Sequence, residues 1–287
     1  PTPMNTASVK PTVATVTKSG TINVQFSGSI PRNYDEHLGP LFFEPFAEKL
    51  AERVAALDPQ AVLELACGTG RLTRHLAKRL DPAVRIAATD INPAMLGFAQ
   101  QGLPTAGVEW NTVDAVDLPY ADATFDVVVA QFGVMFYSDR SKAYREAVRV
   151  LKPGGRLLFT CWNSIEDNPT ARITQSVVDQ FFPVDPPAFY TIPFAYHESM
   201  LIREEVLTAG FGRVQMELLE LEGAADTAAN AARGLLEGSP IHTAITDRDP
   251  FLLPVMRTEL EYRLAARFGA RSLRVPLSAW AVEARVH

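Results

Sequence analysis

Hydrophobic positions in the first 162 residues follow two alternating periods. Apolar residues recur at helical spacing over 44–57, 71–80 and 139–151, and Asn92-Pro93 opens another helix. Between these segments lie short apolar runs at 61–66, 84–90, 107–113, 125–131 and 156–162. A run without alternation, such as FDVVVAQ at 125–131, is typical of a strand buried on both faces. The pattern predicts an α/β fold with a parallel sheet and helical crossovers.

The pattern changes after residue 162. A short helix and a proline-rich loop come first, and a helix at about 198–209 leads into a strand at 213–222. Two helical segments follow at about 225–237 and 251–268, and the closing strand covers 275–286. The last two strands predict an antiparallel hairpin that carries a large helical insertion.

Composition excludes few functions. The 287 residues are 47% hydrophobic, and the net charge of −6 argues against a nucleic-acid partner, which needs clustered Lys and Arg. No apolar run reaches the ~18 residues of a membrane span, and two cysteines make no disulfide framework. These features favour a cytoplasmic protein. The Thr-, Ser- and Pro-rich residues 1–22 predict a disordered tail, which leaves 23–287 as a single domain.

The stretch VLELACGTG, residues 62–70, is the first chemical signal. Gly68 and Gly70 separate the first strand from the next helix, where missing Cβ atoms permit a tight turn and close approach of a ligand. The helix start then offers free N–H groups. A lone pair of glycines also fits a turn that binds nothing.

Asp90 ends the second strand, 20 residues after Gly70, where a carboxylate accepts from ribose hydroxyls or caps a helix. Thr73 stands where a dinucleotide site needs its third glycine, and Glu64 is a poor neighbour for a diphosphate. A cationic nucleoside tolerates that acid. S-adenosylmethionine has a sulfonium and an ammonium and no phosphate.

Four segments together resemble the motifs of class I S-adenosylmethionine-dependent methyltransferases, in the small-molecule branch that includes the ubiquinone and menaquinone C-methyltransferases. The segments are VLELACGTG, ATDIN at 88–92, NTVDAVDLPYADATFDVVVAQFGVMF at 111–136 and LKPGGRLLF at 151–159. The resemblance implies a Rossmann-like, mostly parallel sheet of seven strands in the order 3-2-1-4-5-7-6, with the last strand antiparallel. Helical lid insertions would cover the acceptor site at about 23–43, 163–197 and 224–270.

The resemblance also implies a set of contacts to the cofactor S-adenosylmethionine, which leaves as S-adenosylhomocysteine. Asp90 would hold the ribose, and Asp114, with the exposed Asp117 as a weaker rival, would accept from the adenine amino group. The full implied set is Tyr34, Glu64, Ala66, Gly68, Gly70, Asp90, Ile91, Met95, Asp114, Ala115, Gln131 and Phe132.

The other partner would be a small organic methyl acceptor, apolar or aromatic, walled by lid aromatics such as Phe181, Phe182, Phe189, Tyr190, Phe194 and Tyr196. His197 and His242 are candidates for a general base, if the acceptor needs one. Cys67 reads as a small packing residue, and no Cys/His spacing indicates a metal.

Two other functions stay open at this level. One is a cofactor-binding module without catalysis, and the other is an NAD(P)-dependent oxidoreductase, against which Thr73 and the closing hairpin count. The sequence does not decide the oligomeric state, for which a homodimer is one candidate, or whether O, N or C is methylated.

Overall fold

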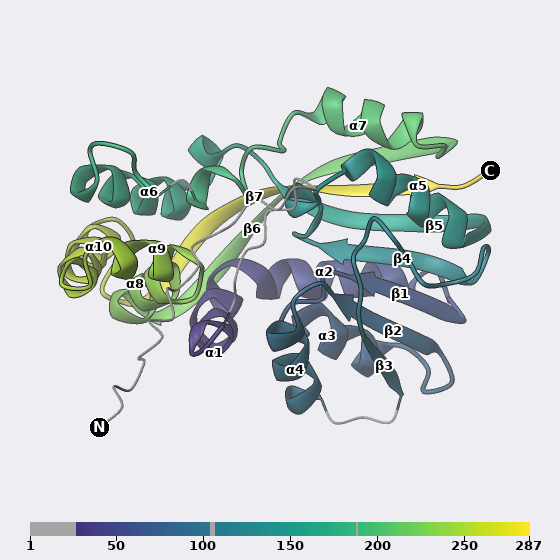
Figure 1. The fold of residues 1–287 in the computed structure, drawn as a ribbon, viewed down its shortest axis with the longest axis horizontal. Coiled ribbons are helices and arrows are strands. Elements are labelled where there is room, and N and C mark those ends of the chain that lie inside the picture. The colour runs from purple at the N-terminus through teal and green to yellow at the C-terminus, as the bar shows by residue number, and fades with distance from the viewer. Residues whose placement is uncertain (1–26, 104–106, 188) are drawn as a thin grey trace, which may run out of the picture.

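The computed structural model describes residues 27–103, 107–187 and 189–287 (Figure 1), so the predicted tail 1–22 lies outside the described residues. The described strands form one sheet in the order β3-β2-β1-β4-β5-β7-β6. Their bounds are β1 Ala61–Leu65, β2 Arg85–Asp90, β3 Val108–Thr112, β4 Phe125–Gln131, β5 Leu151–Trp162, β6 Arg213–Thr227 and β7 Arg271–Arg285. Strands β1 to β5 pair in parallel, and β7 is antiparallel to both β5 and β6. The predicted strand order and orientation are confirmed.

Helices connect the strands and cover the sheet. They are α1 Ile30–Asn33, the π-helix η1 Tyr34–Phe43, α2 Glu44–Ala55, α3 Arg71–Arg79, α4 Pro93–Gly102, α5 Arg140–Val150, α6 Pro169–Phe181, α7 Ser199–Thr208, α8 Ala228–Glu237, α9 Ile241–Arg248 and α10 Leu252–Phe268. Single 3-10 turns lie at 134–136, 165–167 and 189–191.

The apolar strand β4 is buried on both faces, as its continuous hydrophobic run predicts. Val127 and Val129 belong to a cluster with α2 and α3, whereas the alternate residues Val128 and Ala130 belong to the cluster that includes α5 and α7. Successive side chains of a strand point to opposite faces, so one apolar run supplies both layers.

The hairpin of β6 and β7 is longer than the sequence indicates. Its pairing runs from Arg213↔Arg285 to Thr227↔Arg271, so residues 225–227, predicted as helix, are strand. Interstrand hydrogen bonds here override the local preference of an Ala-rich segment. In Figure 1 the hairpin extends past the parallel strands and carries α8 to α10, with α6 beside them, at one end of the molecule. Helix α9 was not predicted.

The predicted turn Lys152-Pro153-Gly154-Gly155 is also part of a strand. Leu151 pairs with Phe125, and the register then shifts before Arg156 pairs with Val127. The turn residues therefore make an irregularity at the start of β5, rather than a loop before it.

The segment before α2 packs against the hairpin through a glycine. A Cβ at Gly223 of β6 would lie 1.8 Å from the Leu41 carbonyl oxygen of η1, a contact that backbone atoms cannot relieve locally. Only a residue without a side chain permits this approach, which holds η1 beside the sheet.

We expect Gly223→Ala to lower the melting temperature by roughly 5–10 °C, since overpacking costs about 1–3 kcal/mol or more. Gly97→Ala is the matched control, because a Cβ there meets no atom within 4 Å and alanine favours the helix α4. Thermal unfolding followed by circular dichroism measures both. An unchanged melting temperature for Gly223→Ala would contradict the close approach.

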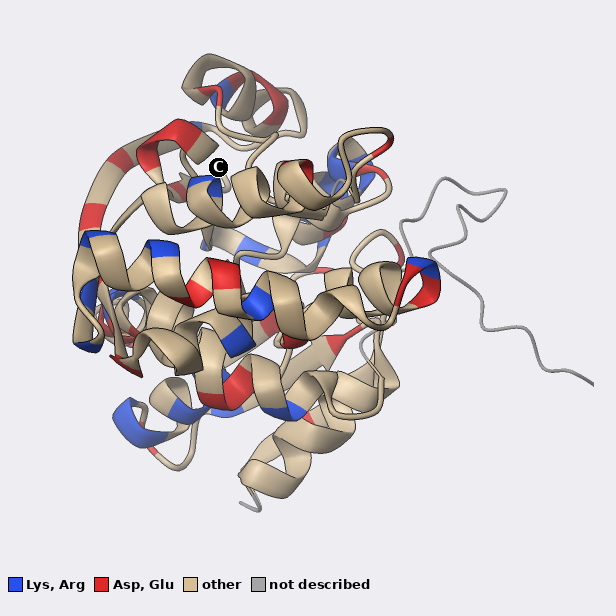
Figure 2. Ribbon diagram, turned by 90° about the vertical axis from the view of Figure 1, so that its left-hand side faces the viewer, with Lys and Arg blue, Asp and Glu red and all other residues tan. Residues whose placement is uncertain are grey.

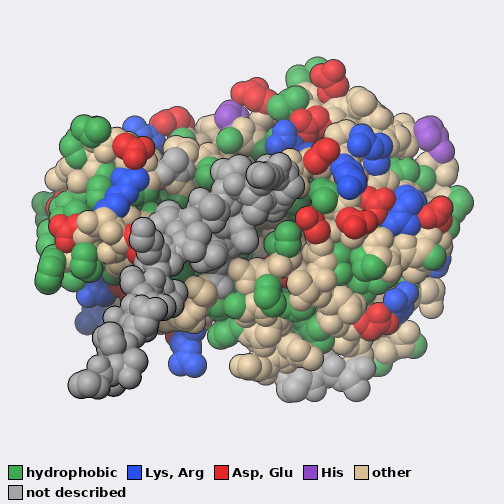
Figure 3. All heavy atoms as spheres, in the orientation of Figure 1, with side chains coloured by type: hydrophobic (Ala, Val, Ile, Leu, Met, Phe, Trp, Pro, Cys, Tyr) green, Lys and Arg blue, Asp and Glu red, His purple; other side chains and the backbone are tan. Residues whose placement is uncertain are grey.

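Charges of both signs are interspersed on the surface. Figure 2 shows Lys and Arg alternating with Asp and Glu on the helices at the α6 and α10 end. Figure 3 shows hydrophobic side chains gathered at the same end, where Phe251 and Tyr262 are 84% and 71% exposed. Over the described ranges, none of the helices has the length and apolar character needed to span a membrane.

Candidate functional site

The turn after β1 has a backbone shape that few residues adopt. Ala66, Gly68 and Gly70 have φ of 53°, 56° and 79°. Gly70 is the residue before α3, so the turn ends where the free N–H groups of that helix begin. A Cβ at Gly70 would lie 3.0 Å from the Ala99 Cβ of α4, so its missing side chain also lets the two helices approach.

Asp90 connects this turn to β2. Its two carboxylate oxygens accept from the Gly68 and Asn92 N–H groups, each at 2.8 Å. The side chain is 8% exposed, and burial raises its pKa even though these hydrogen bonds favour the charged form. The residue predicted to hold a ribose therefore also fixes the glycine turn.

Glu64 is a buried acid one strand away from Asp90. The Thr73 hydroxyl donates to its Oε2 at 2.6 Å, and the side chain is 1% exposed. Burial raises the pKa of Glu64 to about 8. Thr73, which stands at the position of the absent third glycine, is thus the hydrogen-bond donor to this acid. A nearby cationic ligand would favour the charged form of this carboxyl and lower its pKa.

The other residues predicted to surround a nucleoside follow β2 and β3, with Met95 in the first turn of α4. The Met95 Cε is 3.7 Å from where a Gly68 Cβ would stand, so this side chain packs beside the turn. Ile91 is 52% exposed and free to contact a ligand. Asp114 accepts from the Val116 N–H at 3.1 Å, and Ala115 is buried.

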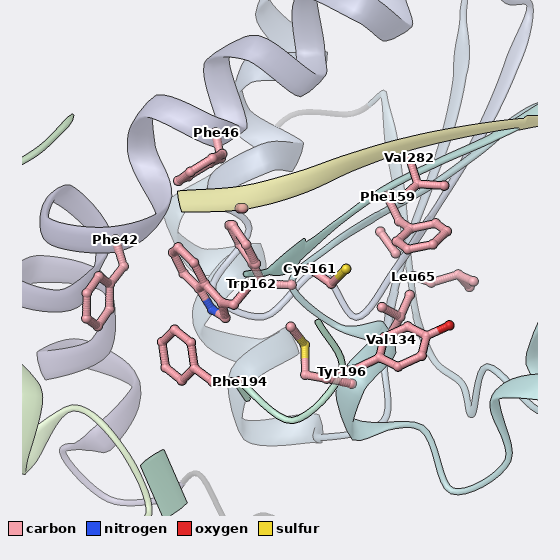
Figure 4. Close-up of a cluster of buried hydrophobic side chains, with 14 of the residues drawn as sticks. Phe42, Phe46, Leu65, Val134, Phe159, Cys161, Trp162, Phe194, Tyr196 and Val282 are labelled. Atoms are coloured by element: carbon pink, nitrogen blue, oxygen red, sulfur yellow. The ribbon is translucent and has the colours of Figure 1, made fainter. Parts of the chain in front are cut away.

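Aromatic rings gather after β4 and β5. The Phe132 and Trp162 rings stack with centroids 3.9 Å apart and an angle of 11°. Figure 4 shows Phe42, Phe46 and Phe194 around Trp162 from separate segments. Phe132 has φ of 51°, a strained value for an aromatic residue directly after a strand.

These rings border a cavity of about 520 Å³, counting its part open to solvent. Each of the three predicted lid segments contributes to it. The lining residues are Tyr34, Leu38, Phe42, Phe43, Phe132, Phe136, Trp162, Phe189, Tyr190, Pro193, Phe194 and Ser239. The cavity lies at the carboxyl ends of parallel strands, where α/β sheets bind ligands.

A charged network holds the segment over the turn. Asp35 of η1 accepts from the Thr69 hydroxyl and from Arg74, both at 2.8 Å, and Arg71 pairs with Glu44. Asp35 was not among the residues predicted from the sequence. The sequence held only an indirect indication of this role, because Arg71 and Arg74 in the helix after the turn are suited to carboxylate partners.

Gln131 connects the same segment to the sheet. Its side-chain amide donates to the Phe43 carbonyl oxygen at 2.8 Å. Tyr34 stacks on Phe43 with centroids 5.0 Å apart, and burial and the nearby Asp90 charge raise its pKa. Tyr34, Gln131 and Phe132 therefore come together where the cavity meets the turn.

Tyr137 is a second residue that sequence reasoning missed. Its hydroxyl is buried without a hydrogen-bond partner and is 3.8 Å from where a Gly133 Cβ would stand. Burial raises its pKa, and the charges of Asp90 and Asp114 raise it further. The hydroxyl thus lies near both predicted ligand carboxylates. The sequence showed that Tyr137 lies a few residues after β4, but it gave no indication that the hydroxyl is buried without a partner.

The two candidate bases lie elsewhere. Neither ring lines the cavity. His197 Nδ1 contacts the Phe194 carbonyl oxygen at 2.8 Å, and its Nε2 lies 3.1 Å from Glu198. His242 is in α9, where its backbone N–H donates to the Ser239 carbonyl oxygen. A catalytic role for either stays a prediction.

The predicted aromatic wall of the acceptor site is only partly present around the cavity. Of the predicted wall aromatics, Phe189, Tyr190 and Phe194 line the cavity, whereas Phe181, Phe182 and Tyr196 do not. Cys67 is buried, and burial raises its pKa well above the ordinary value, which suits packing and not nucleophilic attack. No cluster of three or more metal-ligating side chains occurs in the part of the chain that the structure describes.

Comparison with known proteins gives one family match. A family described as "Methyltransferase domain" matches residues 63–159. Ubiquinone/menaquinone biosynthesis C-methyltransferase UbiE of Klebsiella pneumoniae subsp. pneumoniae is 43% identical over 103 residues, or 34% of this chain. The match spans only 41% of the length of that relative.

Solved structures extend the likeness in fold beyond that region. The YcgJ protein of Bacillus subtilis has a TM-score of 0.56 at 17% identity, covering 85% of this chain and 99% of its own. Phosphoethanolamine N-methyltransferase 2 of Haemonchus contortus, in complex with S-adenosyl-L-methionine, has a TM-score of 0.57 at 16% identity, covering 92% and 59%. At these identities the likeness shows a shared fold.

Proposed function

We propose that this chain, whose residues 63–159 match a methyltransferase domain, is a class I S-adenosylmethionine-dependent methyltransferase that transfers the methyl group of S-adenosylmethionine to a small organic acceptor. The acceptor we propose is apolar or aromatic. One observation carries the proposal: the buried acids Glu64 and Asp90 flank a glycine turn that adjoins a cavity lined mainly by aromatic rings.

The cofactor would lie along the ends of β1 and β2. Glu64, Ala66, Gly68 and Gly70 would contact the methionyl part, and Asp90 would accept from the ribose hydroxyls. Ile91 and Met95 would pack on the adenine, whose amino group would donate to Asp114 beside the Ala115 N–H. Tyr34, Gln131 and Phe132 would surround the sulfonium, since aromatic faces attract cations.

When bound, S-adenosylmethionine supplies a methyl group on a positively charged sulfur that leaves as a neutral thioether. The chain has to align the acceptor with the methyl–sulfur bond and exclude water. The stacked Phe132 and Trp162 and the covering Phe43 suit both tasks, because they form a rigid apolar wall next to the turn. An acceptor that is itself nucleophilic needs no base in this wall.

Titration calorimetry tests the proposal directly. We expect S-adenosylmethionine and S-adenosylhomocysteine to bind and NADH not to bind, because Thr73 stands where a dinucleotide site needs its third glycine and its partner Glu64 is a poor neighbour for a diphosphate. Radiolabelled methyl transfer to a panel of phenols, amines and activated carbons then tests catalysis. Binding of NADH alone would overturn the cofactor assignment, and cofactor binding without turnover on any acceptor would favour a non-catalytic module.

Tyr137 gives a finer test. We expect Tyr137→Phe to weaken S-adenosylmethionine binding by about three- to tenfold, since its unpartnered hydroxyl lies near Asp90 and Asp114. The melting temperature of the ligand-free protein should stay equal or rise, because a buried hydroxyl without a partner costs stability. Tyr262→Phe, at an exposed site on α10, is the control. A lower melting temperature with unchanged affinity would assign Tyr137 a structural role instead.

A further inference from the structure

Ser239 is a polar side chain in an apolar wall. It lies between α8 and α9, is 1% exposed and lines the aromatic cavity. Its hydroxyl has no hydrogen-bond partner. Buried hydroxyls are almost always paired, because an unmade hydrogen bond in a dry environment is costly. The exception here belongs to the lining of the aromatic cavity.

The neighbouring hydroxyl of Tyr190 is already used. It donates to the Leu235 carbonyl oxygen of α8 at 2.6 Å, and this bond ties the 189–191 turn to the helix. Tyr190 therefore closes the wall, and Ser239 keeps its hydrogen-bonding capacity.

The position of Ser239 is fixed by the backbone on both sides. A Cβ at Gly238 would lie 2.6 Å from the Gly234 carbonyl oxygen and 3.1 Å from the Tyr34 nitrogen, so this turn packs directly against η1. On the other side the Ser239 carbonyl oxygen accepts from the His242 backbone N–H at 3.0 Å. The backbone of Ser239 is thus held in place, in a cavity that Phe132 and Trp162 also line.

We propose that the Ser239 hydroxyl is the polar anchor of the acceptor site and selects a planar, apolar molecule with one oxygen or nitrogen hydrogen-bonding group. The inference rests on the proposed function, and it adds a residue that determines specificity. Apolar walls bind flat molecules without orienting them, whereas one placed polar group fixes which edge faces the methyl donor. Acceptors that lack the polar group would leave the Ser239 hydroxyl unpaired.

The experiment compares ligands that differ by a hydroxyl. The protein loaded with S-adenosylhomocysteine is titrated calorimetrically with ethylbenzene and with 2-, 3- and 4-ethylphenol. We expect at least one ethylphenol to bind about five- to tenfold more tightly than ethylbenzene, which is within the range of one neutral hydrogen bond. Ser239→Ala should remove this preference, leave ethylbenzene affinity unchanged and leave the ligand-free melting temperature equal or higher. Ser239→Cys, which is close in volume and a weak donor, should fall between the two.

Thr170→Val is the matched control. Thr170 is also fully buried with an unpartnered hydroxyl, but it lies in α6 outside the cavity lining, so its loss should leave the ligand preference intact. The inference is overturned if no ethylphenol is preferred, if the preference persists in Ser239→Ala, or if Ser239→Ala and Ser239→Cys both lower the melting temperature. Binding of S-adenosylhomocysteine, measured in the same samples, reports separately on the proposed function.

Discussion

Asp90→Ala is expected to weaken S-adenosylmethionine binding by at least tenfold. The charged acceptor for the ribose hydroxyls would be lost, and hydrogen bonds to a carboxylate are among the stronger ones. The structure adds a second reason. Asp90 also accepts from the Gly68 N–H, so the glycine turn would lose its connection to β2. Calorimetric titration of the folded variant measures the change.

Two variants show which of these roles dominates. Asp90→Asn keeps an oxygen that can accept from the Gly68 N–H and removes the charge, so we expect an affinity between wild type and Asp90→Ala. Asp117→Ala removes an exposed carboxylate in the loop after β3 and should bind like wild type. Wild-type affinity in a correctly folded Asp90→Ala would remove Asp90 from the proposed site.

Glu64→Gln is expected to change how stability and cofactor binding depend on pH. The pKa of Glu64 is about 8 in the folded chain and near 4.3 when unfolded, so between these values the folded state holds a proton that the unfolded state has lost. Stability is therefore fully present below the unfolded pKa and is lost as pH rises through the folded pKa. Glutamine does not ionise and can still accept from Thr73. The variant should melt on the order of 5 °C above wild type at pH 8.5 and close to it at pH 5.

Binding should change in the opposite sense. A sulfonium or ammonium near Glu64 favours the carboxylate, so S-adenosylmethionine should expel a proton from wild type at pH 6 to 7 and bind more tightly as pH rises toward 8. Glu64→Gln should bind more weakly and without this dependence. Calorimetry in two buffers of different ionisation enthalpy counts the released protons. Equal proton release from both proteins would show that the cation is not near Glu64.

Much of the fold was determined by local patterns in the chain. The continuous apolar run of β4 and the helical spacing of α2, α3 and α5 specify which surfaces are buried, and buried surfaces specify layers. The sequence did not show how far the terminal hairpin extends, because pairing such as Thr227↔Arg271 depends on residues more than 40 positions apart. For the same reason η1 could be predicted as a covering segment but not as a π-helix held by Asp35.

The sequence by itself determined the identities of the acids and glycines around the turn, because strand ends and tight turns leave marks within a few residues of one another. Only the tertiary structure decided that Asp90 accepts from the backbone of the turn and that Thr73 donates to Glu64. It also decided that the hydroxyls of Tyr137 and Ser239 have no hydrogen-bond partner. A hydroxyl becomes a candidate ligand group only when its surroundings fail to satisfy it. That property belongs to contacts between distant segments and has no signature in the order of residues.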